Sequence, residues 1–147
     1  MPTAKNYHHI LYATDLGPHE KLVRSRLKAI CAQNKADLSI VHIIESMPVF
    51  MDMSGYLNTA EIVERMQKEA QTAIKRLSKD LEIAESNQHI IIGSPKTSIV
   101  ELAHKIKADL IVIGAHNRHL IDNLIGSTTD AVLRASHCDV LAVRFKE

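Results

Sequence analysis

ADLIVIGAHNRHLIDNLIGSTT, residues 108–129, contains an apolar strand, a polar loop and the start of a helix in direct succession. The run from Asp109 to Gly114 is apolar without alternation, which is typical of a strand buried on both faces of a parallel sheet. A loop rich in His and Asn follows it, and Gly126-Ser127-Thr128 then opens a helix. The stretch therefore predicts one strand-loop-helix unit whose loop presents polar groups to a ligand.

The rest of the chain repeats this alternation of strands and helices. Apolar runs bounded by turn residues predict strands, and apolar stripes at helical spacing predict helices. The expected strands are His9–Thr14, Asp37–Ile44, Gln88–Gly93, Asp109–Gly114 and Asp139–Arg144, and the expected helices are about His19–Gln33, Thr59–Leu81, Pro95 to about Lys107 and Ser127–Ala135. Such an order predicts a single-domain α/β protein over residues 1–147, with a mostly parallel five-stranded sheet covered by helices on both faces.

Two helix starts carry recognisable signals. Ser94 suits an N-cap and Pro95 suits the first helical position. The pattern Ser127-x-x-Asp130 resembles a capping box. Residues 46–58, which include three methionines, have no consistent period and predict a long connection. Such connections are commonly lids, binding loops or interface segments, although packing against the domain is the simpler interpretation.

The composition is that of one globular domain. The chain has 147 residues, 46% hydrophobic and 24% charged, enough to bury a core without disulfides. Its formal net charge of +1 leaves no basic field for a nucleic acid, so nucleic-acid binding is not expected. The two cysteines are far apart, and no apolar run approaches the roughly twenty residues of a membrane span. We therefore expect a reduced, cytoplasmic protein that does not contact membranes.

Several motifs of catalysis or cofactor binding are absent from the sequence. No GxGxxG follows a predicted strand, and Gly93-Ser94-Pro95-Lys96-Thr97 lacks the glycines of a P-loop. His8-His9 and His116-x-x-His119 supply imidazoles, but no third ligand completes a zinc site, so no metal is predicted. His42 lies within an apolar strand and is interpreted as a satisfied core or rim histidine. Asp15 has no second acid beside it, which argues against catalysis.

The candidate site lies where the strands end. In a parallel sheet, ligands bind beyond the carboxyl ends of the strands, near the point where strand order reverses. Asp15 and Gly114 belong to this rim, and Gly114 is expected to let the backbone turn at the strand end. Gly126-Ser127-Thr128 offers backbone N–H groups, hydroxyls and the positive end of a helix dipole to a phosphate. An ordinary glycine turn followed by a helix cap explains the same residues equally well.

Six segments occur in an order and spacing that is similar to one known family. They read HILYATDLG, SIVHIIE, GSP, DLIVIGAHN, LIGSTTDAVLRAS and CDVLAVR. Together they cover essentially the whole chain, which resembles the universal stress protein family. The resemblance implies a three-layer α/β/α sandwich, described as adenine nucleotide alpha hydrolase-like, with strand order 3-2-1-4-5. It also implies a cytoplasmic homodimer that is induced under stress and in which the last strands pair.

One branch of this family binds ATP through a loop of the form G-x2-G-x9-G-[ST] and an Asp after the first strand. The resemblance carries these roles to Asp15, Gly114, Gly126 and Ser127, with Ala13, Thr14 and Ile43 lining an adenine pocket, and His116, Asn117 and Thr128 completing the candidate set. Two features depart from the motif. Asn117 replaces the second glycine, and eight residues rather than nine separate it from Gly126. A side chain at Asn117 enters space that a glycine would leave to phosphate.

The A-like branch of the family has a loop without the glycine pattern and does not bind ATP. This chain keeps the final Gly126-Ser127 pair, so it lies between the two branches. Our leading hypothesis is an A-like homodimer that acts in stress tolerance through unknown protein partners without catalysis. Its dimer surface would be the strand Val140, Leu141, Ala142 and Val143. The alternative is a stress sensor that binds ATP or another adenine nucleotide, with at most slow ATP hydrolysis.

Overall fold

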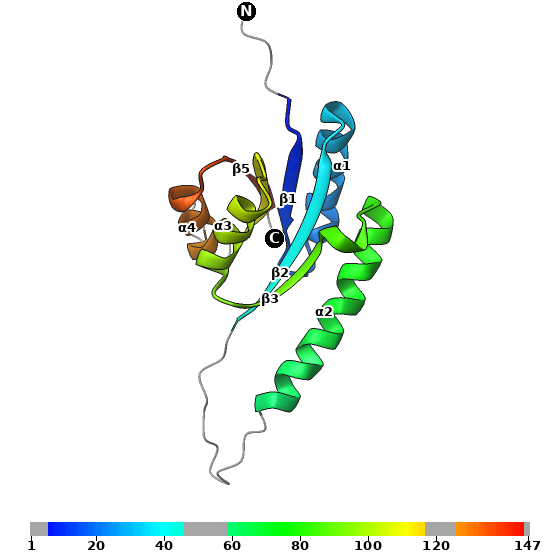
Figure 1. The fold of residues 1–147 in the computed structure, drawn as a ribbon, viewed down its shortest axis with the longest axis vertical. Coiled ribbons are helices and arrows are strands. Elements are labelled where there is room, and N and C mark those ends of the chain that lie inside the picture. The colour runs from blue at the N-terminus through cyan, green and yellow to red at the C-terminus, as the bar shows by residue number, and fades with distance from the viewer. Residues whose placement is uncertain (1–5, 46–58, 117–125, 146–147) are drawn as a thin grey trace, which may run out of the picture.

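The computed structural model describes residues 6–45, 59–116 and 126–145, which alternate between strands and helices (Figure 1). The strands are β1 (His9–Ala13), β2 (Asp37–Glu45), β3 (Gln88–Gly93), β4 (Leu110–His116) and β5 (Asp139–Phe145). The helices are α1 (Glu20–Asn34), α2 (Thr59–Leu81), α3 (Pro95–Lys105) and α4 (Ser127–Ala135), and a short 3-10 helix covers Glu85–Asn87. The expected α/β class is confirmed, and most element bounds differ from the predicted ones by one or two residues.

All five strands belong to one parallel sheet in the order β3-β2-β1-β4-β5. This confirms the expected order 3-2-1-4-5. β1 lies at the centre, where Ala13 pairs with Val41 of β2 on one side and Ile113 of β4 on the other. The chain builds one half of the sheet from β1 to β3 and then returns through α3 to β4, which lies on the other side of β1. Strand order therefore reverses between β1 and β4. The carboxyl ends of these two strands therefore mark the position where such a fold binds ligands.

The helices cover both faces of the sheet, with α1 and α2 on one face and α3 and α4 on the other (Figure 1). Alternate residues of each strand divide between two cores because side chains point to opposite faces in turn. Ile10 of β1 packs in the cluster that contains Leu27 of α1, whereas its neighbour Leu11 packs in the cluster with Val132 of α4. Both strand residues are fully buried. The three-layer arrangement is confirmed.

The structure corrects two local predictions. The capping box at Ser127 is wrong, because Gly126 is the N-cap of α4 and Ser127 is its first helical residue. Gly114 was expected to turn the chain at the strand end, but β4 continues to His116. Ser94 does occupy the N-cap of α3 before Pro95, as predicted, although its side chain makes no capping hydrogen bond. The predicted connection at residues 46–58 and the loop residues 117–125 lie outside the described residues.

Asp109 joins the starts of β1 and β4. Its carboxylate accepts hydrogen bonds from the backbone N–H groups of His8 at 2.9 Å and His9 at 3.0 Å. Burial acts to raise the pKa of Asp109, but these hydrogen bonds outweigh burial and hold the pKa below its usual value. The charged carboxylate therefore stabilises the native state at neutral pH.

We expect Asp109→Ala to lower the free energy of unfolding at neutral pH by about 1–2 kcal/mol, since charge-assisted hydrogen bonds are lost at a partly exposed site. The depressed pKa means that this contribution is complete above the unfolded value of about 3.9 and disappears as pH falls through the native value. Urea unfolding at neutral and acidic pH measures the difference. Asp37→Ala, at an exposed position, is the control and should change little. An equal loss in both variants would contradict this role of Asp109.

His89, at the start of β3, also makes stability fall as pH drops, but it does so at a higher pH than Asp109. Burial lowers the pKa of this half-buried ring, and the nearby Lys105 and His9 lower it further. A histidine with a depressed pKa binds a proton more readily in the unfolded chain, so stability falls as pH drops below about 6.5.

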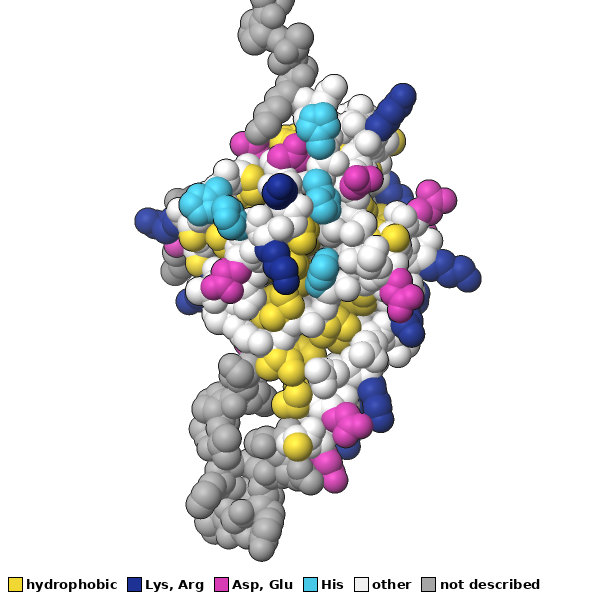
Figure 2. Space-filling model, in the orientation of Figure 1, with side chains coloured by type: hydrophobic (Ala, Val, Ile, Leu, Met, Phe, Trp, Pro, Cys, Tyr) yellow, Lys and Arg dark blue, Asp and Glu magenta, His cyan; other side chains and the backbone are white. Residues whose placement is uncertain are grey.

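Figure 2 shows that several histidines gather on the upper half of one face, whereas hydrophobic side chains occupy the centre and lower part of that face.

His89→Gln is expected to reduce the loss of stability between about pH 7.5 and about pH 5.5. The reason is that the neutral amide takes up no proton on unfolding. Urea unfolding midpoints at the two pH values measure the slope. Gln71→Asn, an exposed change on α2 that removes no titratable group, is the control and should keep the wild-type slope. A slope unchanged in His89→Gln would refute the assignment.

Candidate functional site

A cleft of about 1180 Å³ lies over the carboxyl ends of the strands. Its walls come from the β1–α1 turn, the ends of β2 and β4, and the first turn of α4. Met66 of α2 and Phe145 of β5 also line it. The cleft therefore occupies the crossing point between β1 and β4, where this class of sheet binds ligands.

Eight of the ten predicted site residues line this one cleft. They are Ala13, Thr14, Asp15, Ile43, Gly114, Gly126, Ser127 and Thr128. Of the other two, His116 is the last residue of β4, and Asn117 lies outside the described residues. The structure thus brings together residues from four separate segments of the chain. Their contact with a nucleotide stays a prediction.

Two hydrogen bonds between side chains and backbone fix the β1–α1 turn. Thr14 Oγ1 accepts the N–H of Leu16 at 3.0 Å, and Asp15 Oδ1 accepts the N–H of Gly17 at 2.8 Å. Leu16 adopts a left-handed backbone with φ of 59°. A left-handed conformation costs roughly 1–2 kcal/mol in such a residue, which these bonds help to offset. The turn holds the exposed Asp15 carboxylate in one position on the rim.

His42 is held at the rim by the same turn. Its Nδ1 lies 2.9 Å from the backbone oxygen of Thr14. Because a carbonyl oxygen only accepts, Nδ1 carries the proton and donates, which leaves Nε2 as an acceptor in the neutral ring. The interpretation of His42 as a satisfied histidine is confirmed. The sequence did not indicate that this residue also lines the cleft.

The sequence analysis also missed the wall formed by the start of α1 and the end of β5. His19, the N-cap of α1, stacks on Phe145 with ring centroids 4.2 Å apart. Tyr12 lies behind this wall, and burial raises the pKa of its hydroxyl to about 12. Pro18, His19 and Glu20 lie three to five residues after the rim residue Asp15, so their position in the sequence could have suggested this role. The contribution of Phe145 could only be seen once the sheet order was known.

Gly126 leaves open space at the start of α4. Among the described residues, a Cβ placed on this glycine would meet no atom within 4 Å, and its φ of −55° and ψ of 150° suit any residue. The described part of the fold therefore does not require glycine here. The first N–H groups of a helix have no partner within the helix, and the dipole is positive at this end. The open space above them suits a phosphate.

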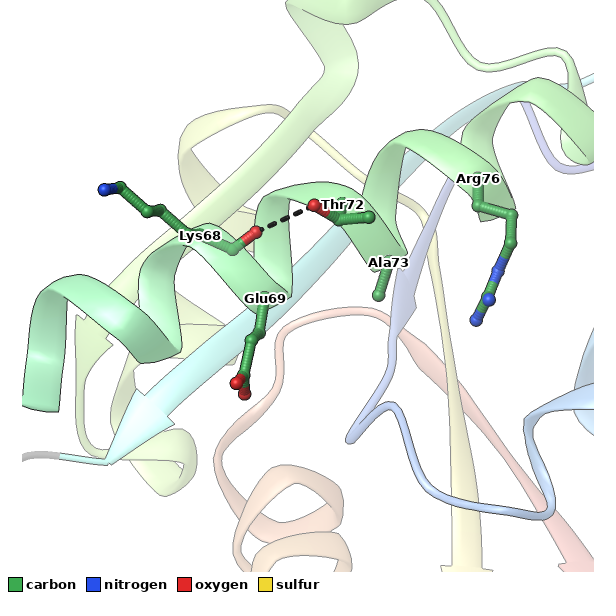
Figure 3. Close-up of a pocket in the computed structure, with 5 residues that line it drawn as sticks. All are labelled: Lys68, Glu69, Thr72, Ala73 and Arg76. Carbon is green, nitrogen blue, oxygen red and sulfur yellow. Dashed lines mark hydrogen bonds between the residues drawn. The ribbon is translucent and has the colours of Figure 1, made fainter.

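A smaller hollow of about 430 Å³ lies against α2 (Figure 3). Its described lining consists of Lys68, Glu69, Thr72, Ala73 and Arg76, all from one helix. Figure 3 shows Glu69, Ala73 and Arg76 pointing to one side of the helix and Lys68 pointing away from it. Thr72 donates to the backbone oxygen of Lys68, as solvent-facing threonines in helices often do. Its described lining comes from a single helix, whereas that of the cleft comes from several segments of the chain, so the cleft is the better candidate.

In residues 6–45, 59–116 and 126–145, no three His, Cys, Asp or Glu side chains group as ligands of a metal ion. Among the helices that the structure describes, none combines the length and apolar character needed to cross a membrane.

Two kinds of comparison show what this chain is similar to. A sequence model of the Universal stress protein family matches residues 6–144. Universal stress protein A homolog 1 of Coxiella burnetii is 38% identical over 97% of this chain and 99% of its own length. Homolog 2 of the same organism is 33% identical over 96% of this chain and 97% of its own.

Solved structures agree with the fold. Hypothetical protein MJ0577 superposes with a TM-score of 0.80 at 25% identity, covering 96% of this chain and 98% of that one. The universal stress protein of Lactobacillus plantarum gives a TM-score of 0.76 at 20% identity, over 96% and 100% of the two chains. A universal stress protein in complex with cAMP gives 0.66 at 23% identity, over 97% and 100%. With sequence, strand order and these likenesses in agreement, the chain belongs to the universal stress protein family.

Proposed function

We propose that this universal stress protein works by binding, and that its cleft holds an adenine nucleotide. The open space at Gly126, above the N-terminus of α4, is the observation that carries the proposal. Ala13, Thr14 and Ile43 would line the adenine, and Asp15 would accept hydrogen bonds from the ribose or the base. The phosphate would then lie against the first turn of α4, where backbone N–H groups and the hydroxyls of Ser127 and Thr128 are available.

The volume of the cleft supports this proposal. Pockets for small molecules commonly measure about 300–1,000 Å³, so a cleft of about 1180 Å³ has room for a nucleotide. The protein solved with cAMP has the same fold, but at 23% identity that likeness concerns the fold. ATP stays within the proposal as one of the adenine nucleotides.

Thermal unfolding with cAMP, AMP and ATP tests the proposal. A ligand that binds only the native state raises the melting temperature by mass action. Asp15→Ala should remove most of that rise, whereas the exposed control Asp37→Ala should keep it. No rise with any of the three nucleotides at about millimolar concentration would contradict nucleotide binding.

We further propose a homodimer that forms through β5. This strand lies at one edge of the sheet, a position that favours pairing with another strand, and Leu141 on it is 37% exposed. Val143 is buried in the core of the monomer, so its side chain would contribute little to the contact. Light scattering after size exclusion at micromolar concentration should give twice the monomer mass. Leu141→Lys should shift the protein toward monomer, and a monomeric wild type would refute the proposal.

The remaining part of the proposal is a role in stress tolerance in the cytoplasm, exerted through protein partners. We assign no catalytic step to the cleft. Asp15, the residue nearest to such a role, already accepts the N–H of Gly17 within its own turn. Survival of a strain that lacks the protein, complemented with the wild type or with Leu141→Lys, tests the role in stress and its need for the dimer.

A further inference from the structure

The charged side chains around the cleft are mainly acidic. Its described lining contains the carboxylates of Asp15, Glu20, Glu45 and Asp130, and the guanidinium of Arg134. Asp130 already holds that guanidinium, with both carboxylate oxygens 3.0–3.1 Å from Arg134 Nε. Three carboxylates therefore face the cleft without a matching cation in its described lining. This is an unusual wall for a site that would take a polyphosphate.

Glu20 shares one neighbouring guanidinium, that of Arg24, with another carboxylate. Its Oε1 atom is buried and accepts no hydrogen bond among the described residues. Arg24 Nε lies 3.4 Å from this oxygen, but Arg24 donates its hydrogen bond to Asp80, at 2.9 Å. Lys28 also pairs with Asp80, at 2.9 Å. Arg24 therefore forms an ion pair with Glu20 through Nε and donates to Asp80 through Nη1, so its single charge is shared by two carboxylates. Burial raises the pKa of Glu20 despite Arg24 and Arg76.

The positive helix ends offset only part of this charge. Each helix N-terminus supplies about half a positive charge, and α1, α3 and α4 begin at the cleft. Glu20 and Asp130 already lie in the first turns of α1 and α4. One phosphate at the open start of α4 meets a favourable field, but every further phosphate adds charge near unmatched carboxylates.

The wall that contains Glu20 is continuous with the proposed phosphate position. His19, beside Glu20, stacks on Phe145, and the Phe145 ring packs against Gly114. The backbone oxygen of Gly114 accepts a hydrogen bond from Thr129 in the first turn of α4, at 3.5 Å. The N-termini of α1 and α4 therefore stand on either side of the ends of β4 and β5. A chain of phosphates that starts at Gly126 would extend into this acidic region.

We propose that Glu20 makes the cleft selective for an adenine nucleotide with one phosphate charge, a cyclic phosphodiester, and against ADP and ATP. This inference rests on the proposed function, because it concerns which nucleotide the same cleft prefers. Affinity should fall in the order cAMP, AMP, ADP, ATP as charge increases. Glu20 acts here as a specificity-determining residue through its charge at the wall.

Calorimetric titration with these four nucleotides, in excess EDTA so that ATP keeps its full charge, tests the inference. We expect wild type to bind cAMP about tenfold or more tightly than ATP. Glu20→Gln keeps the shape and removes the charge, so the affinity for ATP should rise about threefold or more while that for cAMP changes little. Glu101→Gln, an exposed change on α3 outside the lining of the cleft, should keep the wild-type ratio.

Salt provides a second measurement that does not depend on a variant. Raising the salt concentration from about 0.05 to about 0.5 M should narrow the ratio of the cAMP and ATP affinities in the wild type, because charges are screened. If the wild type bound ATP as tightly as cAMP, or more tightly, the inference would be overturned and the proposed function would remain. An unchanged ratio in folded Glu20→Gln would overturn the role of Glu20. Failure of every nucleotide to bind would overturn both.

Discussion

Gly126→Val is expected to abolish the rise in melting temperature that a nucleotide causes, while the protein without ligand keeps nearly its wild-type stability. The backbone at Gly126 has a conformation that any residue adopts, and a Cβ there would meet no atom of the described residues within 4 Å. We therefore expect the added side chain to leave the described fold undisturbed. It does occupy the space at the start of α4 that we assign to the phosphate.

The size of the effect makes this a sharp test. A nucleotide at a hundred times its dissociation constant stabilises the native state by about 2.7 kcal/mol. For a domain of this size, each kcal/mol corresponds to roughly 2–4 °C in melting temperature. Wild type should show that rise and Gly126→Val should show almost none. Isothermal titration with cAMP would give the same answer as a loss of measurable heat.

Ala135→Val is the matched control, because it adds a valine at the exposed opposite end of the same helix. It should keep the full nucleotide-induced rise. If Gly126→Val also kept that rise, the phosphate would not lie at the start of α4. If Gly126→Val unfolded without ligand, the glycine would serve the fold instead.

The fold followed from the sequence because each segment carries a consistent local signal. The unbroken apolar run of β4 indicates burial on two faces, and the stripe along α2 predicted its bounds from Thr59 to Leu81 correctly. The capping box at Ser127 failed for a local reason. Both Ser127 and Gly126 suit a helix start, and the side-chain pattern does not reveal which of them keeps a non-helical backbone.

The site could be predicted in part, and the division has a physical basis. Ala13, Asp15 and Ile43 lie within two residues of the carboxyl ends of their strands, and parallel topology alone brings such ends to one rim. Glu20 and Phe145 belong to the cleft for other reasons. The environment of Glu20 depends on where Arg24 directs its guanidinium, and the position of Phe145 depends on β5 lying beside β4. Neither the direction of the Arg24 side chain nor the pairing of β5 with β4 can be predicted from the residue pattern.

Gly114 is expected to behave in the opposite way to Gly126, although both were predicted as ligand glycines. A Cβ on Gly114 would lie 3.0 Å from Phe145 Cε1 and 3.4 Å from Val23 Cγ2. Both neighbours are buried, and Phe145 is stacked on His19. We therefore expect Gly114→Val to destabilise the protein without ligand by about 3 kcal/mol, at the upper end of the usual cost of overpacking.

Urea unfolding of Gly114→Val in the wild type and in a Phe145→Ala background separates packing from other causes. If the contact with the ring is the reason for glycine, truncating the ring makes room and the cost of Gly114→Val falls by about 1 kcal/mol or more. An equal cost in both backgrounds would show that the ring is not what excludes a side chain. Gly114 would then be required by the backbone of β4 or by the packing of Val23, and the contrast with Gly126 would have to be explained on those terms.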